Sequence, residues 1–99
     1  MNTILRISEV LHQKYGYYVP LREIGYESNL FYKDDLDENL VPSEVIEHLV
    51  EPFMTEAASY TDLEGNDYVV IQVETGDVIP YEIWIVNGEL KKDFLEGLK

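Results

Sequence analysis

Hydrophobic positions recur at helical spacing near the start of the chain. Ile4, Ile7 and Leu11 share one face of a helix. Gly16 stands where such a helix would end, because glycine readily adopts the left-handed conformation that closes a helix. The pattern therefore predicts a helix over residues 3–15.

The segment that follows has no helical period. Residues 17–24 are predicted to be irregular or extended, because Pro20 argues against a central strand. Residues 26–32 are expected to form a short edge strand. Four acidic side chains crowd residues 33–40, which predicts a solvated loop.

A second helix is predicted to begin near Pro42, because proline suits the first position of a helix. Its apolar stripe would consist of Ile46, Leu49 and Val50. Pro52 would end it, since proline lacks the N–H group that a helix needs.

The remainder of the chain is rich in β-branched and aromatic residues, and turn residues interrupt it. Asn87-Gly88 is a strong hairpin signal, because both central residues of a type I′ turn need a positive φ. Strands are predicted over residues 54–61, 67–74, 80–86 and, briefly, 90–94. With the edge strand included, we expect an α+β fold with two helices packed on an antiparallel sheet of about five strands, in one domain over residues 1–99.

The charge of the chain narrows the choice of partners. Asp and Glu number 20 against 7 Lys and Arg, a formal net charge of −13. Hydrophobic residues make up 45% of the chain, so we expect a folded protein despite the acidity. Binding to nucleic acid or to an anionic membrane is disfavoured, because phosphate groups attract Lys and Arg. The charge predicts either a basic protein partner or a simple role in solubility.

Catalytic and cofactor chemistry finds little support. The chain has no Cys, and His12 and His48 lie far apart with no third ligand at metal spacing. Asp34, Asp35, Asp37 and Glu38 lack the glycine and the terminal Glu of a calcium loop. We expect no metal, no cofactor and no enzyme activity. The absence of Cys fits a reducing cytoplasm, and neither a secretory signal nor an apolar run long enough to span a bilayer is visible, so we expect a cytoplasmic protein.

Glu44 and Glu47 have a predictable geometry. Three residues apart on a helix, they lie on one face with Cβ atoms roughly 5–6 Å apart. One DNA strand repeats its charge on a comparable scale, about 3.4 Å of helix axis per phosphate. The alternative is that these acids simply complement the dipole at the start of the helix.

Three segments occur in the same order as in a known family. They are Glu27-Ser28 followed by apolar residues, Pro42-Ser43-Glu44-Val45-Ile46-Glu47, and the strand-rich stretch 60–87, with a weaker likeness at residues 7–10. In this combination the chain resembles the phage uracil-DNA glycosylase inhibitor family, Ugi. It departs from the family at Tyr26, at His48, at Val69 and in the longer segment 32–41.

The resemblance implies an inhibitor that copies DNA. Carboxylates and a hydroxyl on Glu27, Ser28, Glu44 and Glu47 would occupy the DNA-binding groove of a uracil-DNA glycosylase, one inhibitor to one enzyme. A pocket between the second helix and the sheet would receive the apolar side chain that the enzyme inserts into DNA during base flipping. Its lining would be Val45, Leu49, Val69 and Ile71, and the further contacts would be Leu30, His48 and Glu74.

Strand alternation supports part of this lining, because Val69 and Ile71 should share one face of the sheet while Val70 faces the other. The free inhibitor would be a monomer. Two alternatives stay open. One is an acidic mimic aimed at another DNA-binding enzyme, such as a restriction or CRISPR nuclease. The other is an immunity or regulatory module whose acidity serves only solubility.

Overall fold

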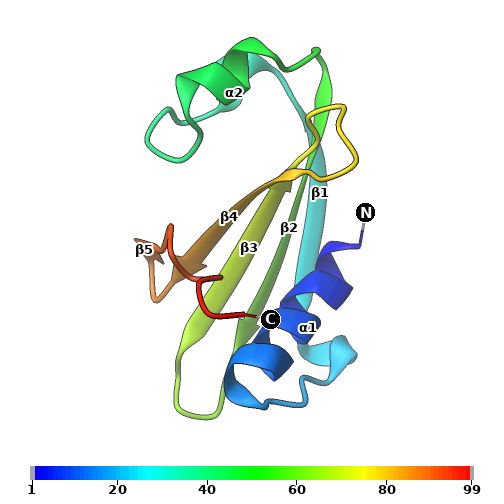
Figure 1. The fold of residues 1–99 in the computed structure, drawn as a ribbon. Coiled ribbons are helices and arrows are strands. Elements are labelled where there is room, and N and C mark those ends of the chain that lie inside the picture. Colours follow the sequence, from blue (N-terminus) through cyan, green and yellow to red (C-terminus); the bar gives the residue numbers. More distant parts are fainter. Residues whose placement is uncertain (1, 99) are drawn as a thin grey trace.

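A five-stranded antiparallel sheet is the frame of the protein (Figure 1). The computed structural model describes residues 2–98. Neighbouring strands in the sheet are neighbours in the sequence, so the first and the last strand form its two edges. The strands are β1 (Gly25–Phe31), β2 (Phe53–Thr61), β3 (Asp67–Val73), β4 (Tyr81–Val86) and β5 (Glu89–Leu90).

Two α-helices accompany the sheet. Helix α1 (Thr3–Tyr15) begins after Asn2, whose side-chain oxygen accepts a hydrogen bond from the N–H of Leu5. It ends at Gly16, which has a φ of 77° and donates its N–H to a helix carbonyl. Helix α2 is much shorter (Ser43–Glu47), and two 3-10 turns, η1 (Leu21–Glu23) and η2 (Lys33–Asp35), lie on either side of β1.

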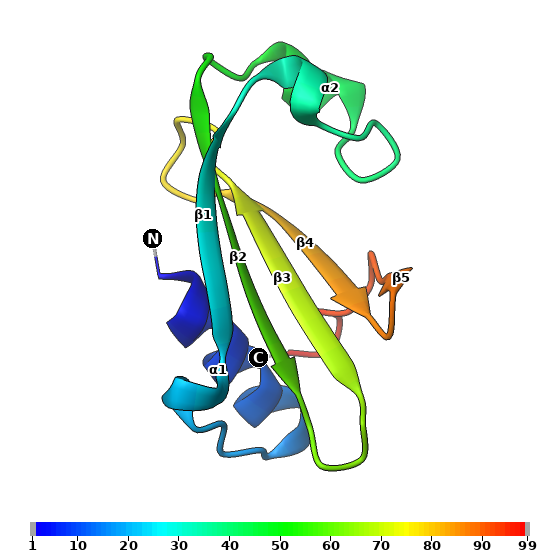
Figure 2. The same ribbon diagram turned by 180° about the vertical axis from the view of Figure 1, so that it is seen from behind.

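The two helices pack against opposite faces of the sheet and near opposite ends of it (Figures 1 and 2). The residues under α1 include Val70, whereas those near α2 include Ile71 and Val73. Successive residues of a strand point to opposite faces, so the two packed surfaces lie on different sides. Neither helix covers a whole face.

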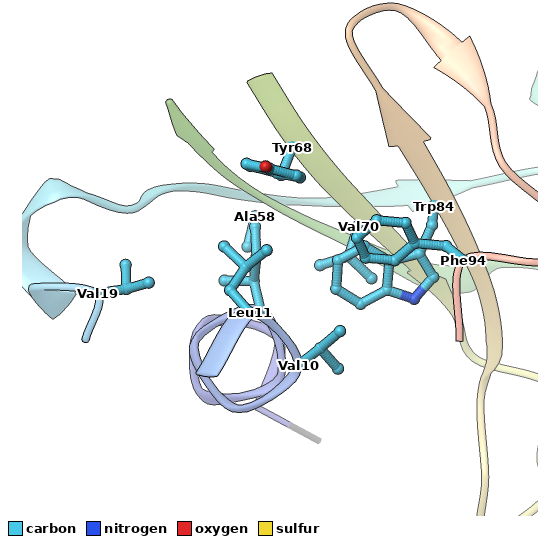
Figure 3. Packing of buried hydrophobic residues seen from close by; sticks show 9 residues of the cluster. Val10, Leu11, Val19, Ala58, Tyr68, Val70, Trp84 and Phe94 are labelled. Atoms are coloured by element: carbon cyan, nitrogen blue, oxygen red, sulfur yellow. The ribbon is translucent and has the colours of Figure 1, made fainter. Parts of the chain in front are cut away.

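The α1 face carries the larger core (Figure 3). Val10 and Leu11 of the helix are fully buried against the sheet. Beneath them Ala58, Val70 and Trp84 stand side by side on β2, β3 and β4. Burying a side chain such as that of Val10 or Leu11 stabilises the fold by roughly 1.5–3 kcal/mol. The contact of these two residues with the row on the sheet therefore anchors α1.

The second core lies between α2 and the other face. Val41 and Leu49, one on each side of the short helix, are buried with Phe53, Val73 and Ile83. Both connections of α2 are therefore fixed to the sheet by buried side chains.

A polar network joins α1 to the sheet beside the larger core. The carboxylate of Glu82 accepts hydrogen bonds from Arg6 Nε (3.0 Å), Gln72 Nε2 (2.9 Å) and Trp84 Nε1 (2.7 Å). Gln72 in turn accepts a 2.8 Å bond from the hydroxyl of Thr3. Burial opposes ionisation of Glu82, but the bonds from Arg6, Trp84 and Gln72 outweigh it and lower the pKa of this carboxyl.

Much of the predicted secondary structure is confirmed. The first helix covers residues 3–15, residues 25–31 form an edge strand, and Asn87 and Gly88 turn with φ angles of 52° and 80°. The α+β class and the five strands are also as expected.

Two predictions about length are wrong. The second helix ends at Glu47 and not near Pro52, because the chain turns there to bury Leu49, and Val50 is left 82% exposed. Pro42 precedes this helix in an extended conformation. The last strand, expected over residues 90–94, spans only Glu89–Leu90. Within residues 2–98, no helix has the length and apolar character that crossing a membrane requires.

Replacing Glu82 by Gln should destabilise the fold by about 1–3 kcal/mol, because charged hydrogen bonds to Arg6 and Trp84 are weakened. The folded-state pKa of Glu82 lies below its ordinary value, so the stabilisation is present above the unfolded-state pKa and is lost as pH falls through the folded-state value. In thermal melts, the Tm of the Glu82→Gln variant and that of the unmodified protein should therefore converge as the pH is lowered from neutral to acidic.

The matched control is Glu89→Gln, which removes a carboxylate from the exposed ion pair with Lys91. This change should alter stability by no more than about 0.5 kcal/mol. A gap between Glu82→Gln and the unmodified protein that stays constant with pH would contradict the role given to the charge.

Candidate protein-binding surface

Strand β1 is an open edge of the sheet. It pairs with β2 along one side only, and residues 25–30 are all exposed. An edge strand presents N–H and C=O groups that a neighbouring strand would otherwise bind. The segment that carries Glu27-Ser28 is therefore accessible both through its backbone and through its side chains.

Glu27 lies on the face of the sheet that α2 approaches. It stands opposite Ala57 of β2, and Ala57 stands opposite Ile71 of β3. Because the residues between Glu27 and β3 are small, the surface sinks into an open hollow of about 350 Å³. Its lining residues are Gly25, Tyr26, Glu27, Ala57, Ala58, Ser59 and Val69.

Ser28 points to the opposite face, beside the side chain of Tyr26. The hydroxyl of Tyr26 donates a hydrogen bond to the carboxylate of Glu56, which raises the pKa of Tyr26. Further along this face Leu30 is 62% exposed and stands opposite Met54. The edge strand thus offers a carboxylate on one side and a hydroxyl and an apolar side chain on the other.

The two glutamates of α2 point away from the core. The backbone carbonyl of Pro42 accepts hydrogen bonds from the N–H groups of Val45 and Ile46 at 3.0 and 3.1 Å, and these bonds start the helix. Val45 and Ile46 are half-buried against the second core, and Glu44 and Glu47 are exposed. The short helix therefore separates an inner apolar side from an outer acidic one.

The chain just after β1 is tied to α2. The side-chain ammonium of Lys33 donates a hydrogen bond to the backbone carbonyl of Glu47 at 3.3 Å. The backbone N–H of Lys33 donates another to the carboxylate of Glu51 at 2.7 Å. These contacts place α2 next to the end of the edge strand (Figure 2). Glu27, the one acid of the strand, and Glu44 and Glu47 of the helix are thus carried by two elements that lie next to each other.

Within residues 2–98 the candidate carboxylates form no ion pair. Residues 2–98 contain two ion pairs, Arg6–Glu82 and Lys91–Glu89. Glu27, Glu44 and Glu47 belong to neither, and no side-chain hydrogen bond to their carboxylates occurs within these residues.

The other predicted contact residues are distributed over several sites. His48 is exposed at the end of α2, and Glu74 is exposed just after β3, where its N–H donates to the carbonyl of Met54 at 3.0 Å. Leu49 is only 4% exposed and belongs to the core.

The four residues that were expected to line one pocket lie in two different places. Those residues are Val45, Leu49, Val69 and Ile71. Val45 and Ile71 are half-buried beside the second core, and Val69 faces the hollow next to Glu27. The expected alternation holds, since Val70 is fully buried on the opposite face.

Two residues of the hollow, Glu27 and Val69, were predicted as contact residues, but the small residues beside them were not. Gly25, Ala57 and Ser59 matter because they are small, and such residues carry no chemical signal of their own. The run Ala57-Ala58-Ser59 in the middle of a strand was the available clue, because strand interiors usually carry larger side chains.

Within residues 2–98, no group of three or more His, Asp or Glu side chains has the arrangement of a metal site. Comparison of the chain with family models, with curated proteins and with solved structures finds no match. What the surface does must therefore be inferred from its residues and geometry.

The two faces of β3 should respond differently to charge. Val70→Asp should lower the free energy of unfolding by about 3 kcal/mol or more, because it places an unpaired carboxylate in the core. Val69→Asp should cost about 1 kcal/mol, since that side chain borders the open hollow. Chemical denaturation followed by circular dichroism measures both, and equal effects would contradict the assignment of faces.

Proposed function

We propose that this protein inhibits uracil-DNA glycosylase by occupying the enzyme's DNA-binding groove in place of DNA. A groove that binds DNA is basic, because it must neutralise phosphates. A chain of net charge −13 with exposed carboxylates on a folded scaffold has the complementary charge. The resemblance of its ordered motifs to the Ugi family selects this enzyme among DNA-binding proteins.

The observation that carries the proposal is that exposed carboxylates stand on β1 and on α2, two adjoining elements. Glu27 lies on an edge strand that is paired along one side only, and Glu44 and Glu47 lie on the outer side of a helix tied to the end of that strand. From Glu27 to Phe31 the strand rises about 13 Å, which spans roughly four phosphate steps of one DNA strand. Residues 28–31 carry no acid, so this stretch of the strand separates the carboxylate of Glu27 from those of α2.

An apolar contact would supplement the charges. The hollow beside Glu27 includes Ala57, Ala58 and Val69, and the half-buried Ile71 stands next to Ala57 in the register. In the proposed complex this region receives the side chain that the enzyme inserts into the DNA base stack. Removing this apolar surface from water would add affinity that salt does not screen.

The direct test is an assay of uracil release by a bacterial uracil-DNA glycosylase. Equimolar inhibitor should abolish release from both single- and double-stranded substrates, because both use the occupied groove. Heat-denatured inhibitor of the same composition controls for unspecific effects of a polyanion. Full enzyme activity at large molar excess of inhibitor, with glycosylases from several bacteria, would refute the proposal.

The acidic contacts can be tested separately from the fold. Glu27→Ala, or the pair Glu44→Ala and Glu47→Ala, should speed dissociation of the complex, with a loss of about 2–5 kcal/mol for a contact that is buried on binding. Surface plasmon resonance measures the dissociation rate, and thermal melts should change little because these side chains are exposed.

Glu96→Ala is the matched control, since it removes an exposed carboxylate from the C-terminal segment. It should leave dissociation unchanged. Equal acceleration by all of these variants would mean that net charge, and not the position of the carboxylates, holds the enzyme.

A further inference from the structure

A second hollow lies at the end of the sheet away from α2. It has a volume of about 290 Å³ and opens between the end of α1 and the β2–β3 turn, whose position at that end is visible in Figure 1. Its lining residues are Tyr17, Tyr18, Tyr60, Asp62, Leu63 and Glu64. Three aromatic rings and two carboxylates therefore meet in one concavity.

The aromatic walls are held in place by neighbouring rings. Tyr17 packs against Tyr15 with 5.3 Å between ring centroids, and Tyr15 in turn lies 5.9 Å from the buried Tyr68. Tyr18 packs against His12 at 4.7 Å. This contact orients the Tyr18 ring, although the side chain remains 87% exposed.

Asp62 is a fixed negative charge at the base of the turn. One of its carboxylate oxygens accepts the N–H groups of Glu64 and Asn66, both at 2.9 Å. The other accepts hydrogen bonds from the side-chain amide of Asn66 at 3.2 Å and from the hydroxyls of Tyr17 and Tyr68 at 3.4 and 3.5 Å. Burial opposes its ionisation, but the bonds from Asn66, Glu64 and Tyr17 prevail and lower the pKa of Asp62.

The hollow has a negative potential. Burial raises the pKa of the Tyr17 hydroxyl, and the charges of Asp62 and then Glu64 raise it further. An adjoining hollow of about 380 Å³ shares Tyr60 and Leu63 with the first and adds the carboxylate of Glu23. Neither lining includes a Lys or Arg among the described residues, so a cation would have to come from outside.

These features fit one kind of ligand group. A guanidinium is planar, stacks on tyrosine rings and donates hydrogen bonds to carboxylates, and it is more weakly hydrated than an ammonium ion. Exposed tyrosines are also common at the energetically important positions of protein interfaces, where arginine is frequent too. We propose that the hollow of Tyr17, Tyr18, Tyr60, Asp62 and Glu64 binds an arginine side chain of a protein partner.

The proposed arginine site shares no lining residue with the hollow beside Glu27. The adjoining hollow lies between the two and shares Gly25 and Ser59 with the hollow beside Glu27. Glu27, Glu44 and Glu47 line neither of these hollows, and α2 lies at the other end of the sheet (Figure 2). The second proposal therefore stands or fails independently of the first.

The probe is N-acetyl-arginine methylamide, titrated into the free protein while the ring protons of its tyrosines are followed by NMR. Saturable shifts at millimolar concentration are expected for Tyr17, Tyr18 and Tyr60. The citrulline analogue, a neutral molecule of nearly the same shape, should give none, and the lysine analogue should bind more weakly. Equal shifts with the citrulline and arginine compounds, or no saturable shift with either, would overturn the proposal.

Variants locate the site. Tyr18→Leu keeps an apolar side chain but removes the ring, and Glu64→Gln removes one charge; each should weaken binding of the arginine compound about two- to fivefold. Glu38→Gln is the control, because it removes the same charge from the exposed acidic loop. Both hollow positions are exposed, so the variants should fold. An equal loss from Glu38→Gln would show attraction to net charge and overturn the site.

Discussion

The carboxylate of Glu82 ties the first helix to the sheet beside the larger core. It is the point where α1, β3 and β4 meet, through hydrogen bonds from Arg6, Gln72 and Trp84. Burying a charge is costly unless it is paired and hydrogen-bonded, and here each requirement is met. The network fixes α1 over one end of one face, because a shifted helix would leave Glu82 without its ion pair. Helix α2 packs on the other face through the burial of Val41 and Leu49 on either side of it.

The distribution of charge follows from this division. The chain has 20 acids and 7 Lys and Arg, and within residues 2–98 two of the acids, Glu82 and Glu89, form ion pairs. Glu82 is partly buried and forms an ion pair with Arg6. The acids of β1 and α2 are exposed and lie outside the cores. Crowding of like charges opposes folding, so the two apolar clusters must outweigh this repulsion. A basic partner would relieve it, which favours association with proteins of the opposite charge.

Local patterns in the sequence were sufficient for much of the fold. The helix that ends at Gly16 and the turn at Asn87-Gly88 depend on residues close together in the chain, and both were predicted at their observed places. The alternation of side chains along β3, which puts Val70 on one face of the sheet and Val69 and Ile71 on the other, also depends only on neighbouring residues. The short α2 was not predictable, because its end is set by the burial of Leu49 among residues of distant strands. For the same reason the hollow beside Glu27 stayed hidden: it exists only because the register places Ala57 between Glu27 and Ile71.

The acidic side of α2 depends on the core beneath it. A helix of five residues is far too short to be stable in water, since nucleation costs more than so few hydrogen bonds return. Its shape must come from Val41 and Leu49, whose burial on both sides holds the chain in place. The spacing of Glu44 and Glu47 is therefore set before any partner arrives. Groups that are already ordered lose less conformational entropy on binding, so a rigid core under a short helix favours affinity as well as stability.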